Sequence, residues 1–214
     1  MSNATHPAID PMALEFLREK YPWPTVCPDV PLNPDGWFCG ENRKVLKDLA
    51  PNASIILELG AWLGMSTRMI VDWSGPNTIV ITIDHWKGSS EHVGRPEVAT
   101  LWETFVRNAW DAHRDRLIPM KTTTQDGMRE LYELGVYPDL IYVDASHEAD
   151  LVAKDLETIM TLFPHAHIVG DDWTWTSVRE GVFDVIANAK RMFLPRTTCY
   201  EIFAKGVYAY PATA

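Results

Sequence analysis

Short apolar runs separated by turn-forming residues recur between residues 55 and 170 of the chain. The runs are rich in β-branched side chains and show little alternation of apolar and polar positions. Such runs are typical of strands that a parallel sheet buries on both faces. The pattern predicts strands at residues 55–59, 78–83, 117–122, 140–143 and 167–170.

Apolar residues at helical spacing fill most of the segments between these runs. The predicted helices cover residues 11–20, 41–49, 68–73, 101–117, 128–134, 149–163 and 178–192. A closing β-hairpin is predicted from residues 198–204 and 207–210, joined at Lys205–Gly206. This order predicts a doubly wound α/β domain, with a mostly parallel seven-stranded sheet and a C-terminal antiparallel hairpin.

Residues 1–40 differ in composition from the rest of the chain, because seven prolines alternate with Trp23, Trp37 and Phe38. We expect an extended arm anchored by these aromatic side chains, apart from its short helix. The arm either packs on the domain or covers the substrate site as a lid. A single domain is expected over residues 41–214.

The stretch Ser54–Thr67 reads as a strand, a tight glycine turn and the start of a helix. In α/β folds this unit holds a nucleotide-like ligand at the carboxyl end of the strand. Gly60 would let the backbone turn and approach a ligand without a Cβ in the way. A purely structural turn remains the alternative at this point.

Polar side chains also follow each of the other four parallel strands, where ligands bind in open sheets. The residues in these positions are Asp84, Gln125, Asp126, Asp144, His147, Asp171 and Asp172. Any one of the acids could cap the next helix. Caps alone are a less probable explanation for the whole set.

Asp84 lies 24 residues beyond Gly60, where an acid can accept both ribose hydroxyls of a nucleoside. Dinucleotide enzymes and S-adenosylmethionine enzymes share this feature. A dinucleotide fingerprint needs glycine where this chain has Trp62 and Met65. An NAD(P)-dependent oxidoreductase is therefore the disfavoured alternative.

Three carboxylates, those of Asp144, Asp171 and Asp172, should meet at the ends of two neighbouring strands. They would repel each other unless a positive charge lies among them, and Mg²⁺ or a similar cation takes such oxygen ligands. The alternative is a helix cap with one protonated carboxyl. His147 lies three residues past Asp144 and is a candidate general base, or else a structural histidine.

Four tryptophans lie just beyond predicted strand ends: Trp62, Trp86, Trp173 and Trp175. Trp86 could stack on adenine, and the last two could offer a flat face to an aromatic ring or a sugar. Each could equally fill the core.

Composition indicates which classes of partner and which cellular compartment are compatible with the chain. A formal net charge of −10 and a pI near 5.1 argue against nucleic acid and an anionic membrane surface as partners. Three cysteines without metal spacing fit a reducing compartment, and neither a signal peptide nor a transmembrane span is evident. We therefore expect a cytoplasmic protein that acts on a small molecule and could form a homo-oligomer through its arm.

The segments ILELGAWLGMST, TIDHW, PDLIYVDASHEADLVAKDL and IVGDDWTWTSVREGV together resemble class I S-adenosylmethionine-dependent methyltransferases. The resemblance covers roughly residues 41–187 and is strongest to small-molecule O-methyltransferases of the cephalosporin-biosynthesis and macrolide-sugar type. It implies a Rossmann-like methyltransferase fold and divalent-metal-assisted O-methylation. Residues 163–167 depart from the pattern, since most relatives have a glycine pair there.

The resemblance also implies roles for individual residues. Metal binding would fall to Asp144, Asp171 and Asp172, and His147 would be the catalytic base. The implied cofactor-binding residues are Glu58, Gly60, Ala61, Gly64, Ser66, Asp84, His85, Trp86, Asp126 and Asp144. A non-catalytic S-adenosylmethionine-binding protein remains a further alternative.

Overall fold

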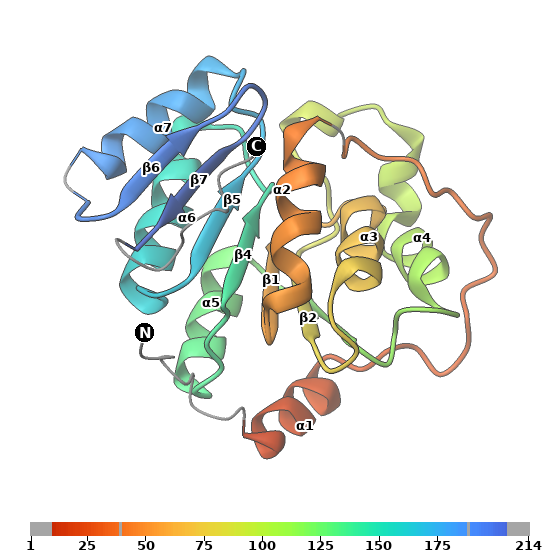
Figure 1. Ribbon diagram of the computed structural model, residues 1–214. Coiled ribbons are helices and arrows are strands. Elements are labelled where there is room, and N and C mark those ends of the chain that lie inside the picture. Colours follow the sequence, from red (N-terminus) through yellow and green to blue (C-terminus); the bar gives the residue numbers. More distant parts are fainter. Residues whose placement is uncertain (1–9, 39, 188, 205–214) are drawn as a thin grey trace.

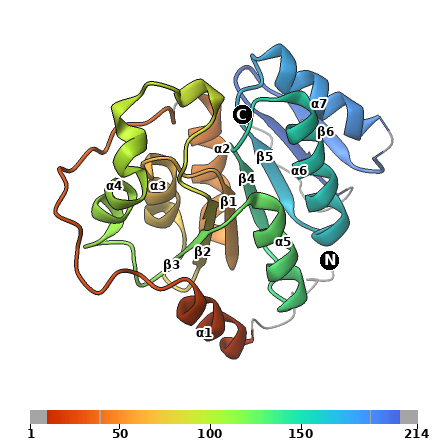
Figure 2. The same ribbon diagram turned by 180° about the vertical axis from the view of Figure 1, so that it is seen from behind.

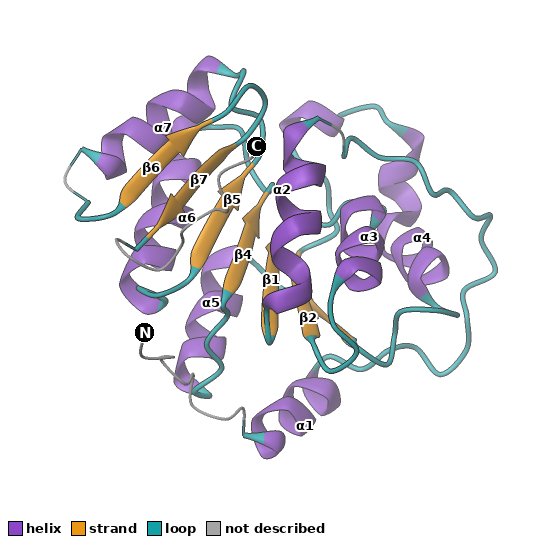
Figure 3. Cartoon of the chain, viewed as in Figure 1, coloured by secondary structure: helices purple, strands orange, loops and turns teal. Residues whose placement is uncertain are grey.

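The computed structural model describes residues 10–38, 40–187 and 189–204. A seven-stranded sheet runs through this part of the chain in the order β3-β2-β1-β4-β5-β7-β6 (Figure 3). The strands are β1 (Ile55–Leu59), β2 (Ile79–Asp84), β3 (Leu117–Lys121), β4 (Leu140–Val143), β5 (His167–Gly170), β6 (Met192–Pro195) and β7 (Tyr200–Phe203). The first five are parallel, and β7 is antiparallel to both of its neighbours. The predicted fold class is confirmed.

Helices cover both faces of the sheet (Figures 1 and 2). One face carries α2 (Glu41–Leu49), α3 (Met65–Trp73) and α4 (Leu101–Ala109). The other face carries α1 (Pro11–Lys20), α5 (Thr124–Glu133), α6 (Ala149–Leu162) and α7 (Thr176–Ile186). Short 3-10 helices lie at Ala50–Asn52, Ser90–His92 and Pro96–Thr100.

The core consists of two apolar layers, one on each side of the sheet. Leu57 and Leu59 of β1 face the layer under α5 and α6, while Ile56 faces the layer under α2 and α3. Successive side chains of a strand point to opposite faces, so a strand buried on both sides is apolar at most of its positions. This requirement produces the continuous apolar runs from which the strands were predicted.

The closing antiparallel hairpin is present, but it joins β7 to β6 and not to the predicted strand at residues 207–210. Both edges of β7 are already paired, with β5 on one side and β6 on the other, so its hairpin partner precedes it in the chain. Residues 207–210, the predicted partner, lie outside the described residues. Two helices also end earlier than predicted. Helix α4 ends at Ala109, and α7 ends at Ile186, so that Met192 belongs to β6.

Helices α5 and α3 begin four and three residues earlier than the sequence indicated. The Thr123 side chain accepts the backbone N–H of Asp126, and this cap starts α5 at Thr124. Helix α3 starts directly after Gly64, which has a left-handed φ of 83°. Both changes lie next to the cavity described below.

The N-terminal arm wraps around the outside of α4 (Figure 1). The Trp23 indole donates to the carbonyl of Leu117 at 3.1 Å and stacks on Phe105 at 6.4 Å between ring centroids. Asn108 of α4 accepts the backbone N–H of Asn33 and donates to its carbonyl. This part of the arm therefore packs on the sheet domain, and Trp37 further along it lines the cavity described below.

A helix–helix contact gives the first testable prediction. Gly181 of α7 crosses α6 so closely that an added Cβ would lie 2.3 Å from the Ala149 carbonyl oxygen and 2.9 Å from the Val152 Cβ. A helical Gly→Ala change normally stabilises by about 1 kcal/mol. Here the overlap should reverse the sign, so that Gly181→Ala lowers the free energy of unfolding by about 1–3 kcal/mol in urea denaturation.

The exposed neighbour Glu180 supplies the matched control. Glu180→Ala should change the free energy of unfolding by no more than about 0.5 kcal/mol. A Gly181→Ala variant as stable as the parent chain would contradict the close packing of α6 on α7.

Candidate active site

A cavity of about 660 Å³ opens at the carboxyl ends of the parallel strands. It lies where the strand order reverses between β1 and β4, the position at which open α/β sheets bind ligands. Its volume falls within the range of small-molecule sites. Its walls include, at the strand ends and in the segments that follow them, Gly60, Ala61, Ser66, Asp84, His85, Asp144, His147, Asp171 and Asp172. The structure thus brings most of the predicted site residues into one cavity.

The floor of the cavity is the glycine turn after β1. Gly60 has a φ of 86°, and a Cβ there would lie 2.0 Å from the Asp144 carbonyl oxygen. Only glycine fits this conformation and this contact. The turn of β1 and the end of β4 therefore touch through their backbones.

Asp84 braces this turn from the end of β2. Its carboxylate accepts the backbone N–H groups of Ala61, Trp62 and Trp86, at 2.9, 3.1 and 2.7 Å. A carboxylate has about four acceptor positions, so one remains for a ligand hydroxyl. Asp84 thus lines the cavity and fixes the shape of its floor at the same time.

Glu58 lies beneath the turn and is fully buried. The hydroxyls of Ser66 and Thr67, at the start of α3, each donate to its carboxylate at 2.5 Å. Burial raises the pKa of Glu58 to about 7, against the opposing effect of these donors. This predicted cofactor residue ties β1 to α3 and does not line the cavity, whereas Ser66 does.

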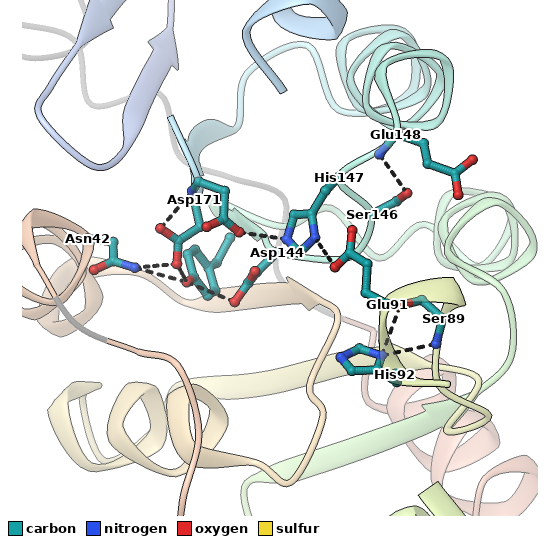
Figure 4. A network of polar contacts seen from close by, with 11 residues as sticks. Asn42, Ser89, Glu91, His92, Asp144, Ser146, His147, Glu148 and Asp171 are labelled. Atoms are coloured by element: carbon teal, nitrogen blue, oxygen red, sulfur yellow. Dashed lines mark hydrogen bonds and ion pairs between the residues drawn. The ribbon is translucent and has the colours of Figure 1, made fainter. Parts of the chain in front are cut away.

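Three of the predicted residues form a compact group at the ends of β4 and β5. Single ligand atoms of Asp144, His147 and Asp172 all lie within 4.8 Å of one another (Figure 4). Asp172 reaches this group through a left-handed backbone, with a φ of 53°. The group contains two carboxylates and one imidazole.

Asp171 is not part of this group, although the sequence predicted it as a metal ligand. Its Oδ2 accepts from the Tyr142 hydroxyl at 2.6 Å and from the Asn42 amide at 2.5 Å, and its Oδ1 accepts the Asp172 N–H at 2.8 Å. These donors occupy most of its acceptor capacity. Burial raises the pKa of Asp171 to about 6.

Burial also raises the pKa of Asp144 well above its usual range, and the charges of Asp171 and Asp172 add to the effect. The repulsion expected from the sequence among these three carboxylates is therefore present.

His147 lies between two carboxylates. Its Nε2 is 2.6 Å from an Asp172 oxygen, and its Nδ1 is 2.7 Å from an oxygen of Glu91 (Figure 4). The contact with Asp172 and then that with Glu91 raise the pKa of His147 to about 9, although burial opposes them. The predicted base is thus a cation at neutral pH in this arrangement, and it compensates part of the acidic charge.

Besides Glu58, the predicted residues that do not line the cavity are Gly64, Trp86, Gln125, Asp126 and Trp173. The Trp86 indole is buried against Trp102 and Phe105, so it is not placed to stack on a ligand. Trp173 packs against the core residue Tyr200. Asp126 is exposed on the first turn of α5, and the neighbouring residues Thr122 and Thr124 line the cavity instead. Trp62, Trp175 and His85 do line it, as predicted.

The mouth of the cavity was missed by the sequence reasoning. The His92 ring stacks on Trp62 with ring centroids 4.1 Å apart, and the Trp37 ring lies 6.2 Å beyond it. Arg95 lies 4.6 Å above the Trp37 ring. Glu91 and His92 belong to a polar loop without periodicity, so no pattern marked them. Trp37 was noted only as an anchor of the arm.

The sequence matches the family described as a methyltransferase domain over residues 57–173. The match covers more than half of the chain, so the chain belongs to this family. No curated protein is matched by the sequence. The membership confirms the enzyme class predicted from the motifs, a class I S-adenosylmethionine-dependent methyltransferase.

Solved structures show the same fold. Cofactor-bound Rv0187 from MTB is 18% identical, with a TM-score of 0.60, over 92% of this chain and 91% of that one. The O-methyltransferase TomG from Streptomyces achromogenes, involved in tomaymycin synthesis and in complex with SAM, is 17% identical, with a TM-score of 0.61, over 92% and 91%. The O-methyltransferase from Bacillus cereus in complex with SAH is 18% identical, with a TM-score of 0.56, over 94% of both chains.

Among the described residues, no helix is long and apolar enough to cross a membrane. The cytoplasmic location stays a prediction.

The buried Glu58 gives a pH-dependent prediction. Its pKa rises from 4.5 to about 7 on folding, so between these values the folded chain holds a proton that the unfolded chain has released. Wild-type stability relative to Glu58→Gln should therefore fall as pH rises from 4.5 to 7, by a total on the order of 3 kcal/mol.

Urea unfolding of both proteins at pH 5 and pH 8 measures this change. Any constant loss from the altered hydrogen bonds of Glu58→Gln cancels between the two pH values. An unchanged difference would mean that Glu58 ionises as easily in the folded chain as in water.

Proposed function

We propose that this methyltransferase transfers the methyl group of S-adenosylmethionine to a hydroxyl of a small molecule, with the assistance of a divalent cation such as Mg²⁺. The observation that carries the proposal is the backbone contact between Gly60 and Asp144. Through it, the glycine turn and the group of Asp144, His147 and Asp172 face one cavity.

The cofactor half of the proposed site is the floor formed after β1 and β2. Gly60, Ala61 and Ser66 line it, and Asp84 retains an acceptor position for a ribose hydroxyl. Structures similar in fold, TomG and the Bacillus cereus enzyme, are complexes with SAM and SAH. They support S-adenosylmethionine as the cofactor of this chain.

The metal half would be formed by Asp144 and Asp172, with His147 as a third ligand or as the base. Carboxylate oxygens are the ligands that Mg²⁺ and Mn²⁺ prefer, and imidazole is compatible with several divalent metals. The pKa of Asp144 is raised first by burial and then by the nearby charges of Asp171 and Asp172, so a cation beside it would favour its ionised form. When bound, a divalent cation supplies a positive charge that favours ionisation of an acceptor hydroxyl.

His147 is proposed to receive the proton of that hydroxyl. In the arrangement described here the imidazole is protonated, because Asp172 and Glu91 hold it on both sides. It can act as a base only when Asp172 turns to another positive partner. Glu91 would then keep the Nδ1 side of the ring fixed, leaving Nε2 directed to the acceptor.

The acceptor is proposed to be a small aromatic or sugar-bearing molecule. Trp37, His92 and Trp175 surround the mouth, and Trp175 lies 4.6 Å from the His147 ring between centroids. Flat rings of this kind suit aromatic and sugar faces. The net charge of −10 argues against a nucleic-acid acceptor.

Titration calorimetry tests the cofactor. S-adenosylhomocysteine should bind to the purified protein and NAD⁺ should not, since Trp62 and Met65 replace the glycines of a dinucleotide turn. The same titration with Mg²⁺ present checks whether the two ligands bind together. Binding of NAD⁺ alone would refute the methyltransferase cofactor, and binding without turnover in a hydroxyl-substrate screen would favour the non-catalytic alternative.

A pair of variants separates the two halves of the site. Asp144→Asn should abolish turnover and weaken cation binding while leaving S-adenosylhomocysteine binding within about twofold, because it removes a charged ligand but keeps the shape. Asp84→Asn should weaken S-adenosylhomocysteine binding and spare the cation. Unchanged turnover of Asp144→Asn would remove the metal from the mechanism.

A further inference from the structure

The hydroxyl of Tyr142 lies between two carboxylates at the edge of the cavity. It is 2.6 Å from Oδ2 of Asp171 and 3.2 Å from Oδ2 of Asp144. The ring itself is fully buried, in edge-on contact with Phe38 at 5.7 Å between centroids. A phenylalanine would fill the same space, so the hydroxyl is not required by the packing of the core.

The alternation of strand residues explains this placement. Tyr142 and Asp144 are two residues apart on β4 and its end, so their side chains point to the same face of the sheet. Tyr142 pairs in register with Val169 of β5, which puts Asp171 on that face as well. The phenol therefore lies directly under the space between the two acids.

Asn42, near the start of α2, adds a second buried donor to Asp171 (Figure 4). Its Nδ2 is 2.5 Å from Oδ2 of Asp171 and 3.2 Å from the Tyr142 hydroxyl oxygen. Its Oδ1 accepts the backbone N–H of Arg43 at 2.9 Å, which fixes the orientation of the amide.

We infer that Tyr142 and Asn42 are positioning residues of the proposed cation site. They hold Asp171 behind the site by hydrogen bonds, and the Tyr142 hydroxyl, whose single proton can go to either acid, keeps Asp144 directed at His147 and Asp172. Asp144 accepts the longer of the two tyrosine contacts, so it keeps acceptor capacity for a cation. The inference rests on the proposed metal-assisted function.

Removing the hydroxyl leaves the carboxylates of Asp144 and Asp171 side by side without a donor between them. They should then move apart, and the geometry of the ligand group should loosen. Loss of an outer partner of a metal ligand typically weakens metal binding 10–100-fold. We expect a change of this size for Tyr142→Phe, and a similar direction for Asn42→Leu.

The test is titration with Mn²⁺, followed through the electron paramagnetic resonance signal of the free ion. Wild type, Tyr142→Phe and Asn42→Leu are compared, and S-adenosylhomocysteine binding is measured on each by calorimetry. Tyr200→Phe is the matched control, because Tyr200 is a buried tyrosine of β7 that packs in the other core layer. It should keep the wild-type affinity for both ligands.

The expected result is 10–100-fold weaker Mn²⁺ binding by Tyr142→Phe, with S-adenosylhomocysteine binding within twofold of wild type. Wild-type Mn²⁺ affinity in Tyr142→Phe would overturn this inference but leave the proposed metal-assisted function standing. No Mn²⁺ binding by the wild type would overturn the metal-assisted function together with it. If Tyr142→Phe misfolds and loses binding of both ligands, Asn42→Leu takes its place. Weaker Mn²⁺ binding by Asn42→Leu would then support the inference, and wild-type affinity would overturn it.

Discussion

The backbone at Gly60 lies against the backbone at Asp144, where the order of the strands reverses. Because no side chain fits between them, the distance between the turn after β1 and the end of β4 is fixed by main-chain contact. The braces around this contact, Asp84 above the turn and Glu58 below it, hold the turn in place. The rest of the cavity is built outward from this pair of backbones.

The main unfavourable interaction in this cavity is the repulsion among its carboxylates. The cavity gathers the carboxylates of Asp144, Asp171 and Asp172, yet no lysine lines it among the described residues. On one side the neutral Tyr142 hydroxyl donates a hydrogen bond to Asp171. On the other side the imidazole of His147 lies beside Asp172. Charge balance around these three carboxylates is therefore partial among the described residues, with Arg95 as a further lining cation.

The parts of the molecule set by local pattern could be predicted from the sequence. Continuous apolar runs located the five parallel strands, and the glycines at 60 and 64 located the turn. Other features depend on longer-range geometry: Asp172, with a left-handed φ of 53°, lies in the group with Asp144 and His147, and its neighbour Asp171 does not. Trp86 was predicted at the cavity, but its indole packs in the core, and rotamer choice of this kind leaves no trace in residue spacing.

The segment that carries Glu91 and His92 has two tasks at once. His92 forms part of the aromatic wall at the mouth, and Glu91, one residue earlier, reaches across to His147. A movement that widens the mouth by displacing this segment also takes away one of the two acidic neighbours of the imidazole. Access to the cavity and the proton affinity of His147 are thus thermodynamically linked: with the segment withdrawn, the ring binds its proton less tightly.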